Sequence, residues 1–376
     1  MACSVARERI PRLMAELSAG GMAAAVLCSR PSLRYYTGFA PPLVSSFSVQ
    51  SPVLGACLLR RDEAPLLFLA LELSETPFEE VPHELVVQYS LAVEETWPER
   101  LCARVGEQLQ RLPAGKLGFE MRSCAAEFER RLEAQCPHLQ FVPIEPVLAR
   151  LRAIKDEDEV AAIREAVALA DLGQEVIRGS ARPGLCELEL FEAARRAIDL
   201  RAGRRVAMIA DLISGERTAE SVGEPTTRQM AAGELLISDL GPHWLGYWGE
   251  TCNTLTLGAP NPAQHRAFEA LRDALGEGLA HLRPGVQAGE VDERMRKTLA
   301  AHGGSYFHHS GHGIGLLCHE SPTVVPGCEM PLAAGMVVAL EPGIYFPRHW
   351  GMRIKQVAVV TEHGGEPLSR FRHCLF

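Results

Sequence analysis

The chain has 376 residues, of which 47% are hydrophobic, and its mean hydropathy is +0.00. This length favours two domains, and the composition excludes a disordered or low-complexity protein. The formal net charge of −9 disfavours a nucleic-acid or anionic-membrane partner, because both require a basic surface.

No apolar run reaches the length of a membrane span, and charges interrupt the N-terminal segment, so neither a membrane anchor nor a signal peptide is expected. Eleven cysteines occur without a CxxC pair or a zinc-knuckle spacing. The sequence therefore predicts reduced thiols and a cytoplasmic protein.

The first half alternates short apolar runs with helical stretches, which is typical of an α/β domain. The aromatic segment Arg34–Phe39 is expected to form a turn in which Gly38 supplies an unusual backbone conformation. We expect strands at Ala23–Leu27, Val53–Leu59 and Pro65–Leu69, and helices at Ala103–Leu112 and Ala125–Gln135.

A domain boundary is expected near residue 153, giving an α/β domain over 1–153 and a second domain over 154–376. Asp156 is a plausible helix N-cap, and Glu159, three residues later, completes a capping-box pattern. The apolar stripe that follows has helical spacing and consists of Val160, Ile163, Val167 and Ala170.

The second half contains an internal repeat. Arg182-Pro183-Gly184 recurs 101 residues later as Arg283-Pro284-Gly285, each time between two helical stretches. Ala231-Ala232-Gly233 recurs 102 residues later as Ala333-Ala334-Gly335, each time before an apolar strand. If the two copies pack about a pseudo-two-fold axis, they bring two carboxylates, Asp239 and Glu341, to one site.

Each of these acidic strand ends is followed by a turn and a second strand, so two hairpins are expected to face a shared cleft. The first returning strand, Tyr247–Leu257, would place Glu250 and Cys252 on one face by alternation. The second, Met352–Val360, would place Arg353 and Lys355 on one face.

Four histidines lie within twelve residues, in the segments His308–Gly315 and His319–Pro322. Glycines on both sides of His312 let the backbone pass close to its neighbours and leave the imidazole unobstructed. The alternative is a glycine-rich turn with surface histidines, but two repeat-related carboxylates favour a functional site.

Four ordered motifs, DLG–GYWGE, GHGIG, HESP and EPGIY, resemble the pita-bread metallopeptidase family M24, which includes aminopeptidase P, prolidase, methionine aminopeptidase and creatinase. LRAIKDEDEV resembles the linker of that family, and YYTGF resembles a motif of its creatinase-type N-terminal domain. The resemblance implies an α/β N-terminal domain and an α+β pita-bread C-terminal domain with an internal pseudo-two-fold repeat.

Metal-dependent members of the family hold two divalent ions with five side chains. In this resemblance Asp239, His312 and Glu341 match three of those ligands, and Glu250 stands where a second aspartate is usual. The fifth ligand, normally a glutamate, falls on Lys355, which cannot bind a metal while protonated. Peptidase members also carry a histidine where this chain has Val222, and residues 204–242 contain no histidine.

Two arrangements of the site remain open. In the first, the Lys355 ammonium replaces a metal and pairs with Asp239 and Glu341, and no metal binds. In the second, Glu250, His312 and Glu341 hold a single zinc, manganese or iron ion while Lys355 neutralises Asp239. Both are favoured over a dinuclear centre, and the metal-free arrangement ranks first.

Candidate catalytic residues are His312 and His319 as acid or base, Glu341 and Glu250 as groups that activate water, and Lys355 as the fixed charge. Candidate substrate-binding residues are Tyr247, Arg353, Tyr36 and Phe39. The alternative for the three aromatic residues is packing, and for Arg353 it is a buried structural salt bridge. Cys252 could form a thiolate, but a small buried side chain is the better interpretation.

The sequence thus predicts a hydrolase that acts on a C–N bond of a small-molecule substrate, with its dinuclear metal site lost or reduced. One alternative is a catalytically inactive binding or scaffolding homologue. Others are an ordinary metal-dependent Xaa-Pro peptidase or a lyase on the same fold. The resemblance also implies a homodimer in which residues near Arg34–Phe39 reach the partner's pocket.

Overall fold

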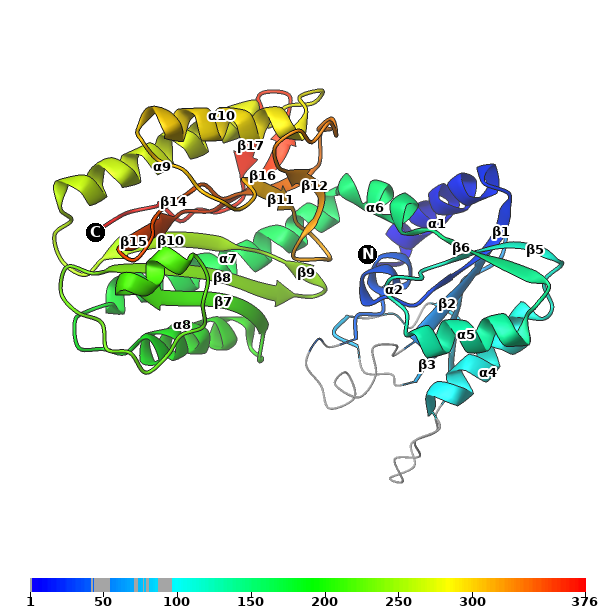
Figure 1. The fold of residues 1–376 in the computed structure, drawn as a ribbon. Coiled ribbons are helices and arrows are strands. Elements are labelled where there is room, and N and C mark those ends of the chain that lie inside the picture. Colours follow the sequence, from blue (N-terminus) through cyan, green and yellow to red (C-terminus); the bar gives the residue numbers. More distant parts are fainter. Residues whose placement is uncertain are drawn as a thin grey trace. The chain divides into compact units, whose positions relative to one another are not determined.

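A computed structural model describes residues 2–41, 43, 55–70, 74–76, 78, 81–86 and 97–376 (Figure 1). The chain forms two compact units, Met1–Arg152 and Ala153–Phe376. Across the described residues, every helix is too short or too polar to cross a membrane.

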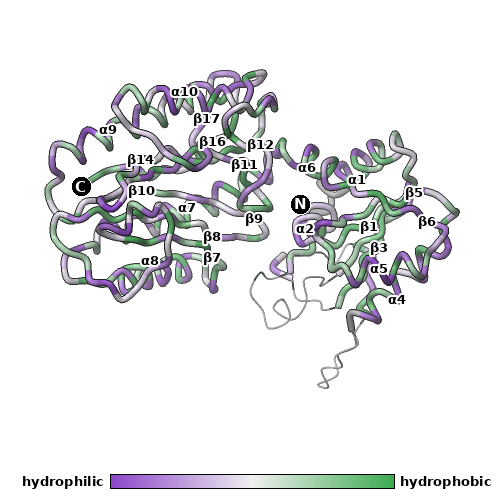
Figure 2. Tube along the Cα trace, in the orientation of Figure 1, coloured by the Kyte–Doolittle hydropathy of each residue, from purple (hydrophilic) through white to green (hydrophobic). Residues whose placement is uncertain are grey.

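The N-terminal unit has a six-stranded mixed sheet in the order β4-β3-β2-β1-β5-β6. β1 pairs antiparallel with β2 and parallel with β5. The core between this sheet and helices α4 and α5 includes Leu101, Phe128 and Phe141. In Figure 2, β1 is mostly hydrophobic, whereas α5 is largely hydrophilic outside its core positions. The strands are β1 (Met22–Leu27), β2 (Gly55–Arg60), β3 (Leu66–Leu69), β4 (His83–Leu85), β5 (Gly115–Phe119) and β6 (Leu139–Pro143). The helices are α1 (Ala2–Ala19), α2 (Arg30–Thr37), α4 (Trp97–Leu109), α5 (Ala126–Gln135) and α6 (Glu145–Ala153).

The three expected strands correspond to β1, β2 and β3, and the two expected helices to α4 and α5. Val53 and Leu54, at the start of the second expected strand, lie outside the described residues.

The expected aromatic turn is wrong over most of its length, because it forms the last part of helix α2. Ser29 caps this helix by accepting a hydrogen bond from the Ser32 N–H, and Pro31 lies in the first turn. Gly38 ends the helix at φ 80°, which confirms its expected unusual conformation. Tyr36 and Phe39 are both 0% exposed. Their burial favours packing in the N-terminal unit.

The C-terminal unit has two halves of similar construction (Figure 1). The first half has the sheet β10-β8-β7, and β9 pairs with β8. Helix α7 begins with a capping box formed by Asp156 and Glu159, as predicted. The elements are α7 (Glu157–Ser180), α8 (Glu187–Ala202), β7 (Ala207–Ser214), the 3-10 helix η1 (Gly215–Glu220), β8 (Leu235–Trp244), β9 (Tyr247–Trp248) and β10 (Thr251–Thr256).

The second half has the five-stranded sheet β12-β11-β13-β16-β17 and the two-stranded sheet β14-β15. Its helices α9 and α10 contribute Leu271, Met295 and Leu299 to the core of this half. The elements are α9 (Pro262–His281), α10 (Ala288–Ala301), β11 (Gly311–Gly313), β12 (Glu320–Val324), β13 (Val337–Leu340), β14 (Gly343–Phe346), β15 (Trp350–Arg353), β16 (Gln356–Thr361) and β17 (Gly364–Pro367).

The internal repeat is visible in the backbone. Gly184, between α7 and α8, has φ 87°, and Gly285, between α9 and α10, has φ 83°. The Gly184 N–H donates to the carbonyl of Met230, and the Gly285 N–H donates to the carbonyl of Leu332, each at 2.9 Å. The same turn is therefore joined to the same point before the next strand in both halves, as the repeated sequence predicts.

Three details of the expected hairpins are wrong. Strand β8 continues to Trp244, so Asp239 lies within the strand rather than at its end. The first returning strand is interrupted between β9 and β10, at Gly249 and Glu250. The second is interrupted between β15 and β16, at Ile354 and Lys355. Glu250 and Lys355 therefore lie at breaks, where the side chain need not follow the alternation of a strand.

The two halves meet along β10 and the break before β16. The Lys355 N–H donates to the Cys252 carbonyl at 3.0 Å. The Arg353 N–H donates to the Thr254 hydroxyl at 2.9 Å, and that hydroxyl donates to the Arg353 carbonyl at 2.8 Å. These bonds join the sheet of one half to a segment of the other and fix the site residues at the seam.

Replacing Glu187 by alanine is expected to lower the free energy of unfolding by about 2–3 kcal/mol, because several donors lose a buried carboxylate acceptor. Glu187 is 0% exposed, and it accepts hydrogen bonds from the N–H groups of Ser214 and Thr226 at 2.8 and 3.0 Å and from both hydroxyls. Urea unfolding measures the change. Glu192→Ala, at an exposed position of the same helix, is the control. Equal losses in the two variants would contradict this account.

Candidate active site

A pocket of about 710 Å³ opens in the C-terminal unit between an apolar wall and a charged wall. The apolar wall comes from α8, β7 and the segment after η1, and includes Leu188, Phe191, Met208, Ile209 and Val222. The charged wall holds Asp239, Glu250, His308, His309, His319, Glu341, Arg353 and Lys355. A pocket of this size suits a small ligand with both apolar and polar groups.

Two aspartates lie directly opposite each other on neighbouring strands, Asp211 on β7 and Asp239 on β8. Like charges in this position repel one another. Arg353 offsets the repulsion, because its Nη2 donates to Asp211 at 2.8 Å and to Asp239 at 2.9 Å. Arg353 is 4% exposed, so this is a buried charge cluster rather than a surface pair.

The Lys355 ammonium lies among three carboxylates. Its Nζ is 2.8 Å from Glu250 Oε2, 3.0 Å from Asp239 Oδ2 and 3.3 Å from Glu341 Oε2. Burial disfavours the charged form, but the three carboxylates outweigh it and hold the pKa of Lys355 well above its usual value. Lys355 is therefore a fixed cation at the centre of the charged wall.

The same contacts keep two of the carboxylates ionised. Burial acts to raise the pKa of Glu250 and of Glu341, but Lys355 first and histidines next outweigh it, so both pKa values fall below their usual range. The other oxygen of Glu250 accepts a hydrogen bond from the Cys318 thiol at 2.7 Å. Burial and that carboxylate raise the pKa of Cys318, which keeps it a thiol.

His312 lies on the short strand β11, where neighbouring strands approach closely. A Cβ at Gly311 would lie 2.2 Å from the Ala339 carbonyl oxygen, and a Cβ at Gly313 would lie 2.2 Å from the Ser321 carbonyl oxygen. The expected reason for the two glycines is thus confirmed. His312 Nε2 lies 3.5 Å from both Glu250 Oε2 and Glu341 Oε1. Burial acts to lower the pKa of His312, but the two carboxylates raise it above its usual value.

The imidazoles of His308 and His319 are neutral at pH 7, because burial lowers the pKa of each to about 4. The ring of His319 lies 3.9 Å from that of His312, measured between centroids. His308 Nε2 lies 3.0 Å from the Tyr345 hydroxyl.

Helix α10 holds the histidine segment in place. Arg296 donates to the carbonyls of Tyr306 and His308 at 2.8 and 2.7 Å, and it is paired with Asp292 on the same helix. Asp292 also accepts a hydrogen bond from Ser310. A second buried pair, Lys155 with Glu320 at 2.6 Å, fixes the strand that follows His319. The glutamate of the HESP motif therefore supports the backbone and does not line the pocket.

Several residues proposed from the sequence are absent from the pocket lining, among them His312, Tyr247 and Cys252. Tyr247 is 2% exposed, and its hydroxyl donates to Glu159 on α7 at 3.2 Å. Cys252 is 0% exposed, and burial raises its pKa, which favours the interpretation of a small buried side chain. Val222 does line the pocket and is 57% exposed.

Residues that the sequence did not propose as site residues include Asp211 and Cys318, as well as His308 and His309, which were noted only as part of the histidine segment. His308 and His309 could have been found, because they directly precede the segment around His312. Asp211 could not, because only the register of β7 against β8 places it opposite Asp239.

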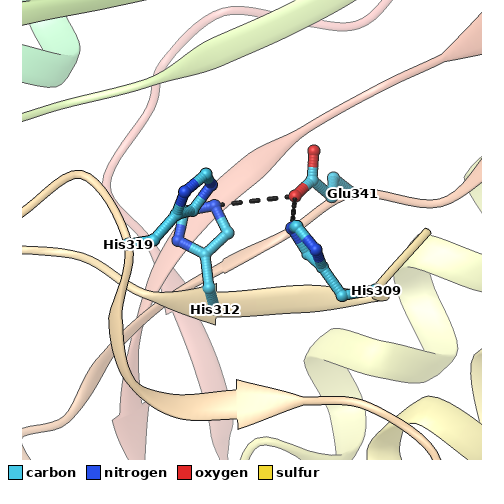
Figure 3. A group of neighbouring side chains, drawn as sticks. All are labelled: His309, His312, His319 and Glu341. Carbon is cyan, nitrogen blue, oxygen red and sulfur yellow. Dashed lines mark ion pairs between the residues drawn. The ribbon is translucent and has the colours of Figure 1, made fainter.

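Among the described residues, two groups of side chains have ligand atoms close enough to hold a metal ion. His309, His312, His319 and Glu341 form the first (Figure 3), and Glu250, Cys318 and His319 form the second. Without a metal, the side chains of the charged wall still include ionised carboxylates that can orient water and neutral imidazoles that can accept a proton.

Two family models match the chain, the creatinase/prolidase N-terminal domain over residues 9–154 and metallopeptidase family M24 over residues 161–362. An Xaa-Pro dipeptidase of Pyrococcus horikoshii is 27% identical over 370 residues, which is 97% of this chain and 98% of the relative. The solved structure of dipeptidase PepE from Mycobacterium ulcerans is 28% identical with a TM-score of 0.82, and covers 100% of this chain and 98% of its own. An Xaa-Pro dipeptidase structure from Bacillus anthracis has a TM-score of 0.86 at 23% identity, covers 99% of both chains and supports the fold alone.

Proposed function

Because the chain belongs to metallopeptidase family M24, we propose that it hydrolyses the peptide bond of a dipeptide or a similarly small peptide. The names of its relatives, Xaa-Pro dipeptidase and dipeptidase, support a peptide substrate. The observation that carries the proposal is the charged wall of the pocket, where Glu341 and three histidines lie beside an apolar wall able to hold a side chain.

The proposed roles follow from the charges of these groups. Glu341 is ionised and accepts a hydrogen bond from an attacking water, which orients it. His319 is neutral at pH 7 and accepts the proton of that water. Lys355 keeps Glu341 and Glu250 ionised by lowering their pKa values, which also makes both carboxylates weaker bases. The histidines are therefore the better bases in this pocket.

We infer that the two-ion centre of the family does not fit this chain. Lys355 Nζ lies within 3.3 Å of Asp239, Glu250 and Glu341, the three carboxylates carried over as ligands. A cation among these oxygens repels a second cation and occupies the lone pairs that would bind it. The proposed hydrolysis therefore does not depend on a pair of metal ions.

The test is a panel of Xaa-Pro dipeptides, other dipeptides and tripeptides, incubated with the full chain purified without added metal. Released amino acids are measured by chromatography, and the amount released by the Glu341→Gln variant is taken as the background. Turnover of a dipeptide above that background is expected. Binding without turnover of any peptide would overturn the proposal and favour the inactive binding homologue, which Lys355 in a ligand position also supports.

The homodimer expected from the resemblance is a separate proposal. Sedimentation of the purified chain measures its mass, and a monomer at micromolar concentration would contradict it. The expected contacts of Tyr36 and Phe39 with a partner's substrate would require those buried side chains to become exposed.

A further inference from the structure

Three buried polar atoms converge on one point of the pocket wall. His309 Nε2, His312 Nε2 and Glu341 Oε1 have no hydrogen-bond partner among the described residues. Glu341 Oε1 nevertheless lies 2.6 Å from His309 Nε2 and 3.5 Å from His312 Nε2. The contact between His309 Nε2 and Glu341 Oε1 is an ion pair when His309 is protonated. With neutral rings, the three buried atoms need another partner, such as a water molecule or an ion.

His319 supplies a fourth donor on the same side. The candidate ligand atoms of the four residues all lie within 4.8 Å of one another, and Figure 3 shows Glu341 between the rings of His309 and His312 with His319 beside His312. Ligand atoms around a tetrahedral zinc, at about 2.0–2.1 Å from it, are roughly 3.4 Å apart. Side-chain shifts of about 1 Å would therefore complete such a site.

The second ring nitrogen of His312 is already arranged for metal binding. Its Nδ1 lies 3.0 Å from the Gly313 carbonyl, which can only accept a hydrogen bond. In the neutral ring the proton is then on Nδ1, and the lone pair of Nε2 faces Glu341. Histidines that bind metals commonly donate their other N–H to a carbonyl in this way.

The two oxygens of Glu341 separate this site from the lysine. Oε2 faces the Lys355 ammonium at 3.3 Å, whereas Oε1 faces the imidazoles. The cluster contains four carboxylates, Asp211, Asp239, Glu250 and Glu341, and two side-chain cations, Arg353 and Lys355. With all four carboxylates ionised, one divalent ion would balance these charges, and two would leave an excess of positive charge. Burial raises the pKa of Asp239, which reduces the negative charge further and disfavours a second ion.

We propose that His309, His312, His319 and Glu341 bind a single divalent metal ion on the histidine side of the pocket. Three imidazoles and one carboxylate favour zinc or cobalt over magnesium or calcium. This site shares His312 and Glu341 with the set carried over from the family, but it replaces Asp239 and Glu250 with His309 and His319. A bound ion would engage the lone pairs of His319 and Glu341, so the roles proposed above for these residues as base and water-orienting group belong to the metal-free chain. The present proposal concerns binding and holds whether or not the chain hydrolyses peptides.

The test uses the full chain after dialysis against a chelator, titrated with Co²⁺ and followed by visible absorption and calorimetry. One equivalent is expected, with the intense absorption of four- or five-coordinate cobalt, and Zn²⁺ should displace it. His309→Gln is expected to weaken binding at least tenfold. The matched control is His308→Gln, because the adjacent His308 contacts Tyr345 and lies outside the ligand set.

Thermal unfolding with and without Zn²⁺ checks that each variant is folded. Zn²⁺ should raise the Tm of the wild type and of His308→Gln, and raise it much less for His309→Gln. Two bound equivalents, no bound cobalt, or equal affinity in His309→Gln and the wild type would each overturn the proposal. Because no result depends on turnover, a failure of the peptidase proposal leaves this test intact.

Discussion

Replacing Lys355 by methionine is expected to lower the free energy of unfolding by about 3–5 kcal/mol, because the change leaves three buried carboxylates without their shared cation. Methionine has a similar length and fills the space, so the loss reports the charge rather than a cavity. Urea unfolding at pH 7 in the presence of a chelator measures it. Lys297→Met is the control, since Lys297 is exposed on α10.

The loss in Lys355→Met should shrink as the pH falls from 7 toward 5. In the wild type, Glu250 and Glu341 have depressed pKa values, so their contribution to stability is present above the unfolded pKa of about 4.3 and is lost only in stronger acid. Without the ammonium, burial raises these pKa values, and the folded variant takes up protons before the unfolded chain does. A loss within 0.5 kcal/mol of the control, the usual size of a surface effect, would contradict the central role of Lys355.

Replacing Glu341 by glutamine is expected to lower kcat/KM for the best peptide by at least about 100-fold, because the amide cannot orient water as an anion and cannot attract a cation. Within the part of the chain that the structure describes, Glu341 is the one carboxylate that contacts Lys355 and both His309 and His312. Steady-state kinetics on the peptide identified by the panel measures the change.

Glu362→Gln, at an exposed position, is the control for that substitution. The Tm of Glu341→Gln separates lost chemistry from lost folding. A folded Glu341→Gln variant with kcat/KM within threefold of the wild type would remove Glu341 from the proposed mechanism.

Much of the fold follows from the sequence, and the family, the pita-bread fold and the class of M24 hydrolase are confirmed. The repeated turns could be predicted because glycines at Gly184 and Gly285 have positive φ and stand at equivalent points. The capping box of α7 could be predicted because it depends on residues three positions apart.

The breaks in the returning strands could not be predicted from alternation. The alternation in Tyr247–Leu257 and Met352–Val360 predicts two continuous strands. The first is interrupted at Glu250 and the second at Lys355, and these two side chains pair with each other. The signals for helix α2 are the cap Ser29 and the first-turn Pro31, which precede the segment Arg34–Phe39 that was expected to form a turn.

The site was predicted in part. Asp239, Glu250, Glu341 and Lys355 do come together, since the repeat and the motifs placed them at related points. Asp211 depends on strand register, and His309 depends on the direction of its ring toward Glu341. The sequence ranked a metal-free site first, whereas we propose a single ion in a different ligand set, because His309 and His312 approach Glu341 Oε1 and His319 lies within the same group.

The most direct test of the lysine's role is the number of divalent ions bound per chain, measured by elemental analysis after equilibration with excess Zn²⁺ or Mn²⁺ and removal of unbound metal. The wild type should retain no more than one equivalent. Lys355→Glu, which replaces the ammonium with a carboxylate, should retain a second. Two equivalents in the wild type would contradict the account that Lys355 occupies the place of a metal.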